Sequence, residues 1–86
     1  MHELSIAGEV CRLAEERLGT DGASRLRVVA VVVGDEAGLE PDNLEFCLGA
    51  LLVQPPFGGG RARITRVPGD DLRVEYLEVD DERSND

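Results

Sequence analysis

Hydrophobic residues recur at helical spacing in the first part of this chain. Between residues 3 and 18 the apolar positions lie on one face of a helix, at Ala7, Val10, Cys11, Ala14 and Leu18. Gly19 and the Thr20-Asp21-Gly22 run that follows it are typical of a helix end. The pattern therefore predicts an amphipathic helix from about Glu3 to Leu18.

The spacing then changes twice. Residues 25–33, RLRVVAVVV, alternate at first and then become continuously β-branched, which predicts a strand buried on one face and partly covered on the other. A loop, GDEAGLEPDN, follows, and Pro41 is well placed as the first residue of a second helix that runs to about Val53. The residues expected to face inward from this helix are Leu44, Cys47, Leu48, Leu51 and Leu52.

Two further strands are predicted, at residues 61–67 and 72–79, and Pro68-Gly69-Asp70-Asp71 between them suits a tight hairpin. The order α-β-α-β-β indicates an α+β fold, a two-layer α/β sandwich with two helices packed on a three-stranded mixed sheet. The last strand either inserts between the first two or lies outside them. We favour insertion, as in split β-α-β units.

Length and composition allow one small domain, which we place at residues 1–80, followed by an acidic tail at 81–86 that we expect to be disordered. The net charge of -9 and the scarcity of aromatic residues argue against nucleic acid and against anionic membrane surfaces as partners. No apolar run approaches the roughly 20 residues of a membrane span, and no signal peptide is recognised. A cytoplasmic protein is expected.

The usual catalytic constellations are missing from this sequence. The only histidine is His2, no P-loop is present, and no CxxC pair is available for a structural zinc site. The two cysteines, Cys11 and Cys47, are expected to be free and to serve as small apolar residues. We therefore expect a protein that is not an enzyme and holds no structural zinc.

One candidate site lies at the start of the chain, Met1-His2-Glu3. A free α-amine, a backbone amide nitrogen and an imidazole at the second residue can chelate one metal ion in a plane. Such nitrogen-rich planar coordination suits Ni(II) or Cu(II), and the residues do not choose between them. For an arbitrary protein, a terminal residue without a role is the more common meaning of such a histidine.

Two segments taken together change this balance. MHELSIA followed by an acidic helix, and VGDEAGLEPDNLEFCLGAL, resemble the HypA/HybF family, the nickel-insertion accessory proteins of hydrogenase and urease maturation. The family tends to have Gly-Glu-x-Ser-Gly-Val-x-Pro where this chain has residues 34–41, and its closing strand is similar to DLRVEYLEVDD. The likeness covers most of residues 1–79.

The resemblance implies a Ni(II) site formed by Met1, His2 and Glu3, and the same fold as derived above. Glu40 is a further candidate ligand. The resemblance also implies delivery of nickel with a maturation GTPase or to a nickel-enzyme precursor, and the capacity to form a homodimer. The family inserts a zinc-binding domain with paired CxxC motifs between its last two strands, and here Pro68-Gly69-Asp70-Asp71 stands in its place.

The preferred hypothesis is thus a nickel-binding accessory protein for hydrogenase or other nickel-enzyme maturation that lacks the zinc domain. The alternative is a degenerate family member that acts as a protein-interaction module without metal delivery. Its partner surface would be formed by acidic residues, Asp35, Glu36, Asp42 and Glu45 together with Glu40. A plain α+β domain without a metal role ranks third. The exposed part of the sheet and Val31–Val33 would permit a dimer.

Overall fold

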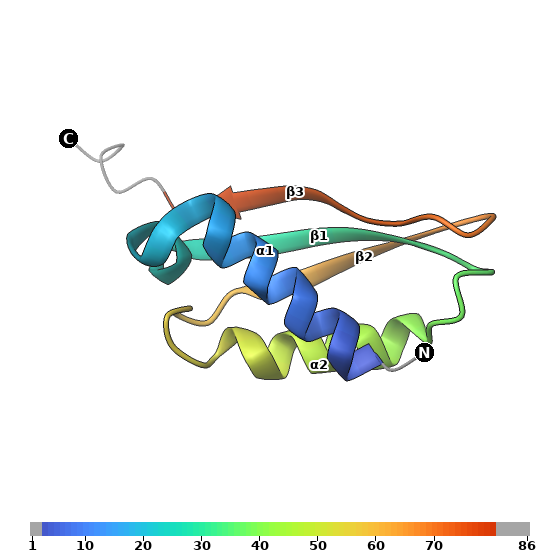
Figure 1. Cartoon of the computed structure of the whole chain (residues 1–86), viewed down its shortest axis with the longest axis horizontal. Helices are drawn as coiled ribbons and strands as arrows, with labels where there is room; N and C mark the ends of the chain where they lie inside the picture. Colours follow the sequence, from blue (N-terminus) through green and yellow to red (C-terminus); the bar gives the residue numbers. More distant parts are fainter. Residues whose placement is uncertain (1–2, 81–86) are drawn as a thin grey trace.

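A computed structural model describes residues 3–80 of the chain and gives five elements in the predicted order (Figure 1). Their bounds are α1 Glu3–Ser24, β1 Leu26–Gly34, α2 Pro41–Leu52, β2 Arg61–Val67 and β3 Leu72–Val79. Two helices pack on a three-stranded mixed sheet, which confirms the α+β class. The predicted disordered tail, residues 81–86, lies outside the described residues.

The first helix reaches further than the sequence indicated. Gly19 has φ 74° and ψ 173°, so the helical backbone is interrupted at the residue where the sequence predicted the helix to end. Helical structure resumes after Gly19 and continues to Ser24, whose hydroxyl donates to the carbonyl oxygen of Asp21 at 2.7 Å. A positive φ is accessible to glycine at no steric cost, so the interruption is a local change of direction rather than the end of the element.

The strand order is β2-β1-β3, with β1 parallel to β2 and antiparallel to β3. The preference for inserting the last strand between the first two is therefore wrong, and Pro68-Gly69-Asp70-Asp71 does not close a hairpin. β1 occupies the centre because its side chains are apolar on both faces, whereas β2 and β3 carry charged residues at exposed positions. A strand that is apolar on both faces loses most water-exposed apolar area when it has a neighbour on each side.

The connection from β2 to β3 crosses the end of β1, and backbone hydrogen bonds fasten it there. The nitrogen of Gly34 donates to the carbonyl oxygen of Asp71 at 2.6 Å, and the nitrogen of Glu36 donates to that of Gly69 at 2.8 Å. A Cβ atom on Gly34 would lie 2.2 Å from the Gly69 carbonyl oxygen. Glycine is therefore required at Gly34 because the crossing backbone occupies the space of a side chain.

The core lies between the helices and one face of the sheet. Leu44, Leu48 and Leu52 of α2 are fully buried, as predicted, while Cys47 and Leu51 are only partly buried at its border. Val31–Val33 are at most 2% exposed within this single chain. The expectation that these valines offer a dimer surface is therefore wrong; dimerisation itself stays a prediction.

None of the helices among residues 3–80 combines the length and the apolar composition that a membrane crossing requires. Both cysteines are free thiols, with Cys11 buried in the core and Cys47 half-buried.

Candidate metal site

The first turn of α1 meets the first turn of α2, and Glu3 makes the connection. One carboxylate oxygen of Glu3 accepts a hydrogen bond from the backbone nitrogen of Glu40 at 2.8 Å, and the other accepts from Nδ2 of Asn43 at 3.0 Å. These two hydrogen bonds, that from Glu40 first, lower the pKa of Glu3. Glu3 is therefore held as an ionised carboxylate at a fixed place on the fold.

Glu40 is the N-cap residue of α2. Its own Oε1 accepts from the backbone nitrogen of Asp42 at 2.9 Å, and its carbonyl oxygen accepts from the nitrogen of Leu44 at 2.9 Å. Pro41 follows at the first helical position, where its missing N–H costs no hydrogen bond. Negative charge is favourable at this end of a helix, which explains why two carboxylates can gather here.

The structure thus brings together two of the predicted ligands, Glu3 and Glu40, from positions far apart in the sequence. Sequence reasoning did not single out Asn43. The one feature that could have indicated a role for it is its position in the first turn of the predicted second helix. An ionised carboxylate offers about four lone-pair positions, so the two hydrogen bonds to Glu3 leave acceptor capacity for a metal ion.

The other two predicted ligands, Met1 and His2, lie outside the described residues. Within residues 3–80 no group of three or more His, Cys, Asp or Glu side chains is arranged to hold a metal ion. The part of the site that is described therefore offers carboxylate oxygens, and the nitrogen ligands of the predicted chelate belong to Met1 and His2.

The acidic residues predicted as a partner surface divide into two kinds. Asp35 accepts a hydrogen bond from the backbone nitrogen of Gly69 at 3.1 Å, and Asp42 pairs with Arg66 of β2 at 3.1 Å. Glu36 and Glu45 are exposed and have no such side-chain contact within the described part of the chain. Asp35 and Asp42 therefore contact other parts of the fold, whereas Glu36 and Glu45 can be changed without removing such a contact.

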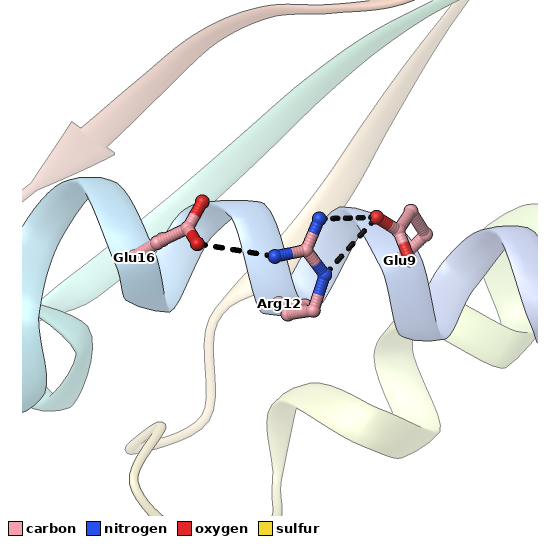
Figure 2. Close-up of polar contacts among 3 residues, drawn as sticks. All are labelled: Glu9, Arg12 and Glu16. Atoms are coloured by element: carbon pink, nitrogen blue, oxygen red, sulfur yellow. Dashed lines mark hydrogen bonds and ion pairs between the residues drawn. The ribbon is translucent and has the colours of Figure 1, made fainter.

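A third polar group lies on the exposed side of α1, where Arg12 lies between Glu9 and Glu16 (Figure 2). Its guanidinium donates to Oε2 of Glu9 through Nε at 3.0 Å and through Nη2, and to Glu16 through Nη1 at 3.1 Å. Arg12 lowers the pKa of Glu9, mainly through their hydrogen bond and in addition through its positive charge. Neighbours three and four residues apart on a helix make such contacts as helix support, so this group is no metal site.

Comparison with known proteins places the sequence among nickel-related proteins. The family described as hydrogenase/urease nickel incorporation, metallochaperone, hypA matches residues 1–71. A hydrogenase maturation factor HypA from Geobacter metallireducens is 38% identical over 69 residues, covering 80% of this chain and 60% of the relative. Another from Dechloromonas aromatica is 33% identical over 69 residues, covering 80% of this chain and 61% of the relative. The chain thus spans about three fifths of the length of these relatives.

Among solved structures, the fold is similar to that of the Ni metallochaperone HypA from Helicobacter pylori in solution. The TM-score is 0.74 at 14% sequence identity, and the match covers 92% of this chain and 97% of the other. At that identity the likeness concerns the fold: both chains share the arrangement of helices and sheet.

Proposed function

This chain belongs to the HypA family of hydrogenase/urease nickel-incorporation metallochaperones, and from that membership we propose that it binds Ni(II) and hands it to the maturation of a nickel enzyme. The observation that carries the proposal is the family match over residues 1–71, which includes both the Met1-His2-Glu3 start and the loop before α2. A metal-delivery role needs no catalytic residues, and the protein is proposed to act without enzymatic activity or structural zinc.

The proposed site is a chelate formed by the α-amine of Met1, a backbone amide nitrogen and the imidazole of His2, with Glu3 beside it. Planar nitrogen coordination suits Ni(II), which is the cargo of the protein and not a resident cofactor. The hydrogen bonds from Glu40 and Asn43 support this role for Glu3, because they keep its carboxylate ionised and in place. Glu40 is proposed as a further oxygen ligand.

Titration calorimetry with Ni(II) tests the site, using protein whose first residue is Met1 with a free amino group. We expect His2→Ala to abolish binding, and an N-terminal tag to do so even though His2 is intact. Glu15→Gln, a change at an exposed position of α1 away from the chain start, serves as the control and should bind Ni(II) as the parent protein does. Binding should weaken on mild acidification, because the amine and the imidazole must lose protons to coordinate. Unchanged binding by His2→Ala would contradict the proposal.

Delivery requires a partner, proposed to be a maturation GTPase or a nickel-enzyme precursor, and Glu36 and Glu45 are the predicted contact residues best suited to a test. They are exposed and can be changed without removing a contact that supports the fold. We expect Glu36→Gln/Glu45→Gln to weaken binding to a purified hydrogenase-maturation GTPase and to leave Ni(II) affinity unchanged. Equal GTPase binding by this variant and the parent protein would contradict the proposed partner surface.

A further inference from the structure

The face of the sheet opposite the helices has its own side-chain pattern. The register places Val28, Ala30 and Val32 of β1 in a central row on this face, because the alternate valines of β1 contact the helical core. The residues that pair with this row point to the same side: Arg61, Arg63 and Thr65 from β2, and Glu78, Tyr76 and Arg73 from β3. We call these nine residues the open sheet face.

Side chains of the edge strands cover the central row. Val28, Ala30 and Val32 are at most 6% exposed although no helix packs on this side. Nη1 of Arg63 reaches the hydroxyl oxygen of Tyr76 at 3.4 Å, although these residues lie on opposite sides of Ala30 in the sheet. Long arginine side chains can cover apolar surface with their stems while their charged ends stay in water. The open sheet face is therefore closed to apolar contact but presents guanidinium groups.

The charge of this face opposes that of the chain. The whole chain carries a net charge of -9, yet the open sheet face has three arginines and one acid, Glu78. Within residues 3–80, Arg61, Arg63 and Arg73 form no ion pair, while Glu78 lies 4.0 Å from Arg27. The arginines of the face are thus available to an external anion.

A hollow of about 540 Å³ adjoins one end of the face. Its lining includes four arginines, Arg25, Arg27, Arg61 and Arg63, and two acids, Glu78 and Asp80. Arg25 contacts Asp21 and the carbonyl oxygen of Asp80, and Arg27 lies 4.0 Å from Glu78. Arg61 and Arg63 are therefore the arginines of this lining that form no ion pair within residues 3–80. The surface is recessed beside Arg61 and Arg63, which leaves room for an extended chain segment.

We propose that the open sheet face binds an extended acidic segment of a partner protein, with Asp or Glu at alternate positions. Arg61 and Arg63 are two residues apart on one strand, about 7 Å, which is also the spacing of alternate side chains in an extended peptide. The planar fork of each guanidinium matches a carboxylate with two hydrogen bonds. Single-stranded nucleic acid fits less well, because its bases stack on aromatic side chains and Tyr76 is the one aromatic residue of the face.

Binding of a fluorescein-labelled peptide in which Glu and Thr alternate tests the proposal, with the Gln-for-Glu peptide as its control. We expect Arg61→Gln/Arg63→Gln to weaken binding of the Glu peptide about tenfold, since two charge-assisted contacts are lost. Arg12→Gln/Arg17→Gln on α1 removes the same charge elsewhere and should keep full affinity. Backbone amide signals of Val28, Ala30 and Val32 should shift on titration, and added salt should weaken the complex.

Four results would overturn the proposal. These are no binding of the Glu peptide at low salt, equal binding of the Gln peptide, an equal loss in the α1 double variant, and tighter binding of oligothymidylate than of the Glu peptide. Circular dichroism melting curves of both double variants show whether each is folded. Should Arg61→Gln/Arg63→Gln fail to fold, the amide shifts of the parent protein decide, and shifts confined to other surfaces contradict the proposal.

Discussion

The carboxylate of Glu3 accepts a hydrogen bond from the backbone nitrogen of Glu40, which joins the first residue of α1 to the N-cap residue of α2. Its second oxygen accepts from Asn43, in the first turn of the same helix. One side chain thus holds together the starts of both helices. The proposed metal site includes the same residue, so one carboxylate contributes both to the contact between the helices and to the proposed site.

Replacing Glu3 by alanine should lower the melting temperature and speed amide hydrogen exchange at Glu40, because the nitrogen of Glu40 loses its acceptor. Glu3→Gln should have a smaller effect, since an amide oxygen still accepts one hydrogen bond. Glu15→Ala, a change on the exposed side of the same helix, serves as the control for helix propensity. Exchange at Glu40 that is equally slow in Glu3→Ala and in the parent would disprove the importance of this contact.

Gly34→Ala should destabilise the protein by about 1–3 kcal/mol. The new Cβ would lie 2.2 Å from the carbonyl oxygen and 2.6 Å from the carbonyl carbon of Gly69, so the connection across the end of β1 must move. Gly49→Ala is the matched control. Nothing lies within 4 Å of a Cβ at that position in α2, and alanine should there be neutral or stabilising by up to about 1 kcal/mol. Urea unfolding measures both, and equal stability of the two variants would contradict the steric account.

The bounds of the elements could be predicted from the sequence where spacing and turn residues agree. The strands Arg61–Val67 and Leu72–Val79 lie where alternation and the Pro68-Gly69 break placed them. The strand order could not be predicted in this way. A short Gly-containing link is typical of a hairpin between neighbouring strands, but here it joins β2 and β3, which lie on opposite sides of β1. The decisive feature was the apolar composition of β1 on both faces, which favours the central position.

The residues of the candidate site could be proposed from the sequence, and they stay a prediction; the contacts that Glu3 makes could not be proposed in this way. Met1, His2 and Glu3 are proposed from ligand chemistry and from the resemblance of the chain start, and Glu40 as a further oxygen ligand. The hydrogen bonds that Glu3 accepts from Glu40 and Asn43 depend on how α1 and α2 cross, and no local pattern specifies that crossing. Likewise, the pairing of Asp42 with Arg66 requires α2 to pack beside β2, which only the three-dimensional arrangement shows.

The two thiols should differ in reactivity. Cys11 is 8% exposed, and burial raises its pKa, so its reactive thiolate is scarce in the folded protein. Cys47 is half-buried at the edge of the core and should react first with a thiol reagent such as dithionitrobenzoate. In Cys47→Ser the fast phase of thiol labelling that the parent shows should disappear. The remaining labelling, at Cys11, should proceed at the rate of unfolding. Fast labelling of Cys11 in that variant would show that the core opens without global unfolding.

The Glu9–Arg12 pair should give a pH-dependent contribution to stability. Because Arg12 lowers the pKa of folded Glu9, this contribution is complete above the unfolded value of about 4.3 and is lost as the pH falls through the lower folded value. The difference in unfolding free energy between the parent and Glu9→Gln should therefore shrink on acidification below that value and stay constant above it. Because the pair is exposed, added salt should reduce the difference at neutral pH.

Urea unfolding over a pH series measures this difference in unfolding free energy, with Glu15→Gln as the control on the same helix. A parent–Glu9→Gln difference that grows on acidification would contradict the sign of this linkage.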